Sequence, residues 1–220
     1  MLRGRPIEET MLYRHASVGV ICFSMIQNEL YFLLGKETTY EARRSGRWCD
    51  FGGKPNPGET YVQTASREFT EEGLATIYVT SEHHLVDHNV VSYQSMVHDL
   101  LSEHQYYCSF KLKIDNVLRI YFVIRIPWQP ESIQLFSKRK QLLLRCHGGA
   151  PKPYVLKFSP AYAQNKIRTE FMEKSQLAYW HVDRIKEVIQ RKSFRYYHHF
   201  FRPSFIHAMT QIIDIMTPGN

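Results

Sequence analysis

Long apolar runs separated by short polar breaks predict buried strands in the first part of the chain. Residues 17–25 (SVGVICFSM) and 29–35 (ELYFLLG) are rich in β-branched and aromatic residues, and Asn28 lies between them as a turn residue. Both runs are almost continuously apolar, as is typical of strands covered on both faces. We therefore expect two strands joined by a short turn, in a sheet with helices on either side.

Similar patterns predict the elements that follow. Residues 106–113 and 117–126 have strong β propensity and flank Asp115-Asn116, which predicts a second hairpin. Further expected elements are strands at 75–80 and 170–180 and helices at 131–145, 182–189 and 203–216. This mixture of elements predicts an α/β fold.

The stretch between these elements with the strongest chemical signal is GGKPNPGETYVQTASREFTEEG, residues 52–73. It predicts a glycine-rich turn followed by an amphipathic helix with the apolar stripe Val62, Ala65 and Phe69. A helix advances by about 100° per residue, so the acids at positions 68, 71 and 72 share a face. Like charges on adjacent turns repel, which a divalent cation would offset. The alternative is an ordinary solvated acidic face.

The spacing of these residues resembles the signature of Nudix hydrolases, G-x5-E-x7-R-E-U-x-E-E-x-G-U, where U is aliphatic or aromatic. The fixed residues present in register are Gly53, Glu59, Arg67, Glu68, Glu71 and Glu72. One departure is visible, because Gly73 follows Glu72 directly, where the family has one intervening residue. We expect the helix to end one residue early, with Gly73 in the left-handed conformation common for a glycine just past a helix.

The resemblance implies a Nudix-type α/β/α sandwich with a mixed central sheet and helical insertions. The chain of 220 residues suits one domain. We expect residues 1–220 to form a single Nudix hydrolase domain. Its parts are a core at about 15–190, insertions at about 81–105 and 129–152, and a C-terminal docking helix at about 203–216.

The same resemblance assigns roles to individual residues. Glu68, Glu71, Glu72 and the main-chain carbonyl of Gly52 would bind Mg²⁺ or Mn²⁺, and Glu68 or Glu71 would deprotonate the attacking water. Gly53 would shape the turn, and Glu59 with Arg67 would form an ion pair that orients the helix. With Glu72 taken as a surface acid, Glu72→Gln is expected to abolish turnover and to leave thermal stability nearly unchanged.

The implied function is metal-dependent cleavage of a pyrophosphate bond in a nucleoside diphosphate linked to another moiety. Such a substrate is a phosphorylated small molecule, for example a dinucleotide or a nucleotide sugar, or capped RNA, which would make the reaction mRNA decapping. The net charge of +7 suits a polyanionic partner but is equally explained by solubility. The alternative function is a non-catalytic Nudix-like module that binds a nucleotide or docks on a protein.

Basic and acidic residues around the signature are candidates for substrate binding. Arg43, Arg44 and Arg47 immediately precede the glycine turn, where guanidinium groups can hold phosphate. Glu173, with Glu170, precedes a strand and would reach the acid cluster from there. In the helix at 131–145, the run Lys138-Arg139-Lys140 would either clamp a long anion or only solubilise the helix, and we favour the second role. The aromatic and basic tail at 191–202 would stack on bases or, as we favour, pack on the core.

The spacing of histidines and cysteines and the lengths of the apolar runs bear on metal binding, on the redox state of the thiols and on location. His84 and His88 are spaced for metal binding on one helical turn, but no second ligand pair accompanies them. The cysteines at 22, 49, 108 and 146 form no C-x-x-C pair, which favours reduced thiols, mostly buried. No signal peptide or apolar run of roughly 18 residues is present, so we expect a cytoplasmic protein without a membrane span.

Overall fold

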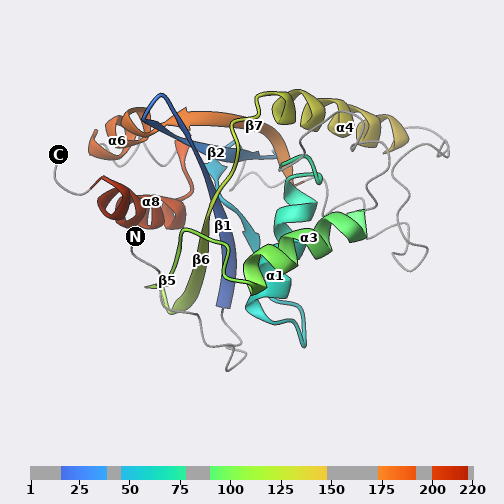
Figure 1. Cartoon of the computed structure of the whole chain (residues 1–220), viewed down its shortest axis with the longest axis horizontal. Coiled ribbons are helices and arrows are strands. Elements are labelled where there is room, and N and C mark those ends of the chain that lie inside the picture. Colours follow the sequence, from blue (N-terminus) through green and yellow to red (C-terminus); the bar gives the residue numbers. More distant parts are fainter. Residues whose placement is uncertain (1–15, 39–45, 78–89, 148–172, 192–199, 218–220) are drawn as a thin grey trace.

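The computed structural model describes residues 16–38, 46–77, 90–147, 173–191 and 200–217 (Figure 1). The strands are β1 (Ala16–Ile26), β2 (Glu29–Glu37), β3 (Trp48–Cys49), β4 (Phe51–Gly53), β5 (Cys108–Ile114), β6 (Val117–Arg125) and β7 (Lys174–His181). The helices are α1 (Tyr61–Glu72), α3 (Val90–Ser102), α4 (Glu131–His147), α6 (Val182–Gln190) and α8 (Pro203–Met216).

Within the described ranges the strands form a seven-stranded mixed sheet built around β1. β1 pairs in antiparallel fashion with β2 and β4, and in parallel with β6 from Ala16↔Leu118 to Phe23↔Arg125. β5 pairs with β6, while β3 and β7 both pair with β2. The parallel β1–β6 pair among antiparallel neighbours confirms the expected mixed sheet.

Alternation along β1 divides the apolar residues between the two faces of the sheet. Val18, Val20 and Cys22 belong to one buried cluster, which also contains side chains of α1 and α3, whereas Ile21 and Phe23 belong to a second cluster with α6 and α8. Figure 1 shows α1 and α3 on one side of the sheet and α6 and α8 on the other. The fold is therefore the expected α/β/α sandwich.

Both predicted hairpins are confirmed, and left-handed residues form their turns. Gln27 and Asn28 join β1 to β2 with φ of 48° and 68°, and Asp115 and Asn116 join β5 to β6 with φ of 50° and 61°. Asn and Asp tolerate this region better than other residues with side chains, which explains how the sequence marks these turns.

α8 lies within the segment expected at about 203–216 and packs on the second cluster. α8 begins with Pro203 in its first turn and buries Phe205, Met209 and Ile212 in the second cluster. Cys22, Cys49 and Cys108 are buried free thiols, as predicted, and the side chain of Cys146 lies outside the described residues. In the described part of the chain, no helix has both the length and the apolar character needed to cross a membrane.

Two sequence-based expectations are wrong in this part of the molecule. Residues 75–77 form turns and not the start of a strand, and residues 78–80 lie outside the described ranges. α1 ends at Glu72 as expected, but Gly73 has a right-handed φ of −84°, and it is Leu74 and Ala75 that are left-handed. The β propensity of the sequence after Gly73 did not determine the local structure. Arg139 of α4 holds this turn by hydrogen bonds to the carbonyl oxygens of Leu74 and Ala75.

The basic run on α4 also differs from the expectation. Lys138 is exposed, but Arg139 and Lys140 are only 6% and 7% exposed, so they do not solubilise the helix. Burial lowers the pKa of Lys140 to about 8, against the effect of the nearby Glu173. Two adjacent buried basic residues on one helix indicate specific partners on the surface against which α4 packs.

Candidate functional site

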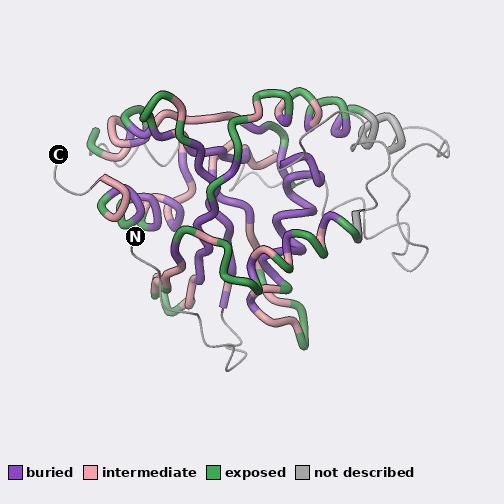
Figure 2. Tube along the Cα trace, viewed as in Figure 1, coloured by how far each residue is buried: buried purple, intermediate pink, exposed green. Residues whose placement is uncertain are grey.

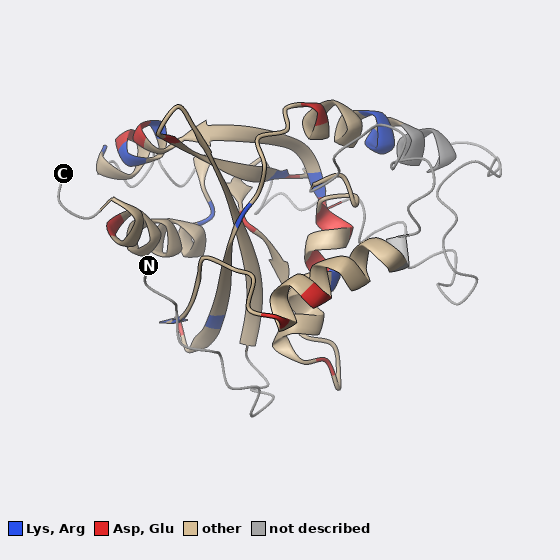
Figure 3. Cartoon of the chain, in the orientation of Figure 1, with Lys and Arg blue, Asp and Glu red and all other residues tan. Residues whose placement is uncertain are grey.

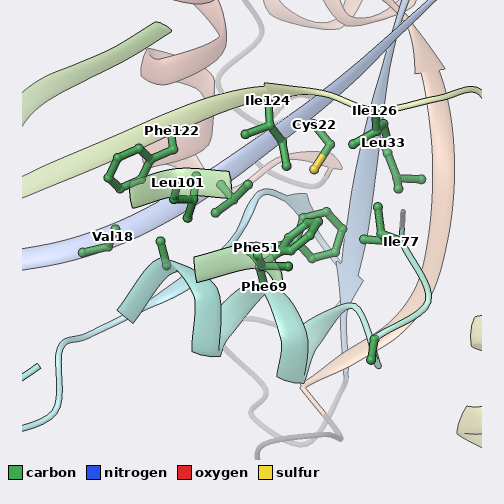
Figure 4. Close-up of a cluster of buried hydrophobic side chains, with 14 of the residues drawn as sticks. Val18, Cys22, Leu33, Phe51, Phe69, Ile77, Leu101, Phe122, Ile124 and Ile126 are labelled. Carbon is green, nitrogen blue, oxygen red and sulfur yellow. The ribbon is translucent and has the colours of Figure 1, made fainter. Parts of the chain in front are cut away.

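The candidate site is formed by α1, which closes the first core and carries the acids on its buried end. Thr60 and Gln63 form a capping box at its N-terminus. Ala65 and Phe69 are fully buried, and Phe69 packs edge-to-face on Phe51 of β4 at 5.4 Å between ring centroids (Figure 4). This packing confirms the predicted apolar stripe and fixes the helix against β4.

The acids of α1 are buried, which excludes the solvated acidic face. Glu68, Glu71 and Glu72 are 8%, 4% and 3% exposed, and Figure 2 shows that α1 is buried over most of its length. Acidic residues recur along α1 in Figure 3. Buried carboxylates need charged or hydrogen-bonding partners, and the structure supplies them from two basic residues.

Arg67 is the first of these partners. Its Nε lies 2.8 Å from Oε1 of Glu59, and its Nη1 lies 2.9 Å from Oε1 of Glu68 and 3.0 Å from Oε2 of Glu71. Its Nη2 also donates to the carbonyl oxygen of Lys54 at 3.1 Å. The Glu59–Arg67 pair predicted from the sequence is therefore present, and the same guanidinium joins the glycine-turn loop to two of the helix acids.

Lys174 of β7 is the second partner and was not identified from the sequence. Its Nζ lies 3.1 Å from Oε1 of Glu72, and it donates to Sγ of Cys49 at 2.9 Å and to the carbonyl oxygen of Asp50 at 3.0 Å. The other carboxylate oxygen of Glu72 accepts the N–H of Gly52 at 2.6 Å. Lys174 is 1% exposed, so all three ammonium donors are used inside the protein.

Gly35 in β2 is a sequence signal for a close approach at this point of the sheet, although it does not identify Lys174 as the residue that makes it. A Cβ atom on Gly35 would lie 2.9 Å from Cδ of Lys174, so the lysine side chain crosses the sheet where β2 has no side chain. The β2–β7 register shifts between Lys36 and Glu37, next to this crossing. A glycine inside a strand of large apolar residues often marks such a close approach.

The two glycines expected to form a turn instead lie in strand β4, paired with β1, and each is required for a different reason. A Cβ atom on Gly53 would lie 2.1 Å from Oε1 of Glu68, so the carboxylate occupies the space that a side chain would fill. A Cβ atom on Gly52 would lie 2.2 Å from the carbonyl oxygen of Val18. The absence of a side chain at Gly53 therefore leaves room for the carboxylate of Glu68. The absence of a side chain at Gly52 leaves room for the main chain of β1.

The pKa values of the carboxyls follow from this environment. Burial raises the pKa of Glu72 to about 8, although the Lys174 ammonium acts in the opposite direction. Burial also raises the pKa of Glu68, and Arg67 opposes it. Burial would likewise raise the pKa of Glu59, but its bonds to Arg67 and Asn56 lower it to about 2. Burial therefore outweighs the basic partners at Glu68 and Glu72, whereas hydrogen bonds outweigh burial at Glu59.

The residues fit a hard divalent cation by their chemistry and charge. Carboxylate oxygens and main-chain carbonyls are the ligands that Mg²⁺ and Mn²⁺ prefer. When ionised, Glu59, Glu68, Glu71 and Glu72 carry four negative charges against the two positive charges of Arg67 and Lys174. The described residues contain no group of three His, Cys, Asp or Glu already arranged around a common metal position.

The expected substrate-binding residues are only partly described. Arg47 is half-buried just before β3, and Glu173 is exposed just before β7. The charge of Glu173 raises the pKa of both Glu68 and Glu72, which places its carboxylate near the acid cluster. Expectations for Arg43, Arg44, Glu170, the His84–His88 pair and residues 192–199 of the tail concern positions outside the described residues.

Comparison with known proteins gives a match to one family model and to one curated relative. Residues 13–121 match the family model described as the NUDIX domain. The uncharacterized protein L534 of Acanthamoeba polyphaga mimivirus is 38% identical over 64 residues, which are 29% of this chain and 21% of that protein. This chain therefore spans about one fifth of the length of that curated relative.

Three solved structures illustrate the structural similarity. An Ap4A hydrolase of C. elegans in a binary complex is 12% identical, with a TM-score of 0.42 over 91% of this chain and 97% of that chain. The NUDIX domain of Shewanella oneidensis NrtR with ADP ribose is 9% identical, with a TM-score of 0.42 over 96% and 94% of the two chains. The MutT protein of Methanosarcina mazei Go1 is 14% identical, with a TM-score of 0.42 over 93% and 95%.

Proposed function

The chain belongs to the Nudix family, and from that premise we propose that it is a hydrolase using Mg²⁺ or Mn²⁺ to cleave a pyrophosphate bond. The substrate class is a nucleoside diphosphate linked to another moiety: a dinucleotide, a nucleotide sugar or capped RNA. The observation that supports this proposal most strongly is the excess of buried carboxylates over basic partners at the end of α1. Such an excess destabilises the protein unless a cation offsets it.

We assign the ligands and roles as follows. Glu68, Glu71, Glu72 and the carbonyl of Gly52 would hold the cation, which when bound neutralises charge on the phosphoryl oxygens and lowers the pKa of water. Glu68 or Glu71 accepts the proton of the attacking water. Arg67 keeps Glu68 and Glu71 in place through its Nη1, and Glu59 orients Arg67. Lys174 and the Gly52 N–H hold the two oxygens of Glu72.

The substrate would approach from the side on which Glu173 is exposed. We propose that Arg47, with Arg43 and Arg44, contacts its phosphates, and that Glu173 contributes to substrate binding. We also propose that residues 1–220 form one Nudix domain, in which α3 and α4 belong to insertions at about 81–105 and 129–152 and α8 lies in the docking segment at about 203–216.

The test is a substrate panel of dinucleotides, sugar nucleotides, capped RNA and inositol pyrophosphates. Each is incubated with Mg²⁺ or Mn²⁺ and, in parallel, with chelator, and phosphate and nucleotide products are measured. The expected result is cation-dependent product from at least one class, lost in Glu68→Gln and Glu71→Gln and kept in Glu103→Gln, which changes an exposed acid beyond α3.

A non-catalytic binding module is the second candidate function. It is favoured by one observation, that Glu68, Glu71 and Glu72 already have basic partners within the chain. Binding of an unhydrolysed nucleotide by the wild-type protein, with no product from any member of the panel, would support this module and exclude the hydrolase.

A further inference from the structure

The turn that follows α1 has an unusual backbone for its sequence. Leu74 and Ala75 have φ of 52° and 51°, and both are buried. Residues with a Cβ atom avoid this left-handed region, and two in succession are uncommon. The turn lies where the chain departs from the Nudix signature, because Gly73 follows Glu72 without the intervening residue. The shortened signature therefore ends in a backbone that needs support from elsewhere.

Arg139 of α4 supplies that support. Its Nη1 donates to the carbonyl oxygen of Leu74 and, at 3.0 Å, to that of Ala75, across 65 and 64 residues of sequence. Arg139 is 6% exposed, so its guanidinium is enclosed with these carbonyls. A cation just past the C-terminus of a helix also interacts favourably with the helix dipole.

The turn is connected to the helix acids through its own main chain. The N–H of Leu74 donates to the carbonyl of Glu71 at 3.3 Å, and the N–H of Ala75 donates to that of Thr70 at 3.0 Å. These bonds close the last turn of α1, on which Glu71 and Glu72 lie. A displacement of the residues that Arg139 holds would therefore move the backbone of both acids.

We propose that Arg139 is a positioning residue that anchors the left-handed turn and thereby holds Glu71 and Glu72 in place for catalysis. This inference rests on the proposed hydrolase function for its catalytic part only. It assigns to α4, which also contacts β7, the role of bracing the shortened end of the signature helix. Arg139 is buried against main-chain carbonyls and is not assigned a contact with substrate.

The experiment compares Arg139→Met, Arg139→Lys and the control Lys138→Met, which changes the exposed neighbour on the same helix. Hydrogen exchange of amides 73–77 is measured without metal, and kcat and KM are measured with metal, well below each variant's melting temperature. In Arg139→Met we expect exchange at 73–77 to be faster by about tenfold or more and kcat to fall about tenfold, with KM nearly unchanged. Lys138→Met should match the wild-type protein.

Arg139→Lys keeps a cation and at least one donor, so its exchange and kcat should lie between those of wild type and Arg139→Met. If Arg139→Met does not fold, the comparison of Arg139→Lys with wild type provides the test. Unchanged exchange at 73–77, or a kcat equal to that of Lys138→Met, would overturn the inference. If the wild-type protein hydrolyses nothing, the proposed function fails, while the exchange data still decide whether Arg139 anchors the turn.

Discussion

Nζ of Lys174 lies 3.1 Å from Oε1 of Glu72, and both side chains are almost completely buried. This ion pair joins the start of β7 to the end of the signature helix. It corrects the expectation that Glu72 is a surface acid that can be removed without effect on stability. Replacing Glu72 alone leaves the Lys174 ammonium without its carboxylate in the interior, and a buried unpaired charge is costly.

The first prediction concerns this pair. Lys174→Met should lower the free energy of unfolding by about 3 kcal/mol or more, because it leaves Glu72 buried without its ammonium. The double variant Lys174→Met/Glu72→Gln should recover roughly half of that loss, since neither charge remains. Urea denaturation of the metal-free protein above about pH 8, where Glu72 is ionised, measures both values. Lys111→Met, at an exposed position of β5, is the matched control. Additive losses in the double variant would show that the two residues do not act as a pair.

The second prediction separates the roles of Gly52 and Gly53 of β4. In Gly53→Ala the new methyl group meets the flexible carboxylate of Glu68, which can move aside. We expect a folded protein that loses ~1 kcal/mol of stability but about 100-fold in kcat, because the displaced acid no longer has the required geometry. In Gly52→Ala the methyl group meets the main chain of Val18, which cannot move, so folding should fail. Equal activity of Gly53→Ala and wild type would contradict the role of Glu68.

The third prediction concerns pH. The folded protein raises the pKa of Glu72 from 4.5 to about 8, so it retains a proton that the unfolded chain releases. The stabilising contribution of this group is complete below pH 4.5 and is lost as the pH rises through about 8. Glu68 shifts in the same direction, whereas the lowered pKa of Glu59 acts only below pH 4.5.

Denaturation of the metal-free protein across this pH interval tests the prediction. The free energy of unfolding should fall toward alkaline pH in wild type, and the fall should be smaller in Glu72→Gln, which has no proton to lose at this position. A slope identical in the two proteins would show that Glu72 is not the group responsible.

Local sequence patterns correctly predicted elements that are determined by residues close together in the sequence. The hairpin at Asp115-Asn116 and the stripe of Ala65 and Phe69 depend on neighbouring residues, and both are confirmed. The Glu59–Arg67 pair was expected from the resemblance to the Nudix signature, and the structure contains it.

The partners of Glu72 and Leu74 were missed because they come from distant parts of the chain. Lys174, the partner of Glu72, comes from β7 and also contacts Cys49, which is 125 residues away in sequence. Arg139, the partner of Leu74, lies 65 residues from it. No periodicity or spacing in the sequence indicates which distant basic residue will contact α1 or the turn after it. Residues 75–77, the described part of the strand expected at 75–80, form turns for the same reason, since β propensity is weak against a turn held by tertiary contacts.

A Mn²⁺ titration followed by electron paramagnetic resonance, which measures free Mn²⁺, tests whether the buried acids of α1 bind a divalent cation. The wild-type protein should bind Mn²⁺, and the double variant Glu68→Gln/Glu71→Gln, while still folded, should lose this binding. Equal binding by the two proteins, or no binding by wild type, would show that the buried acids of α1 do not hold a divalent cation.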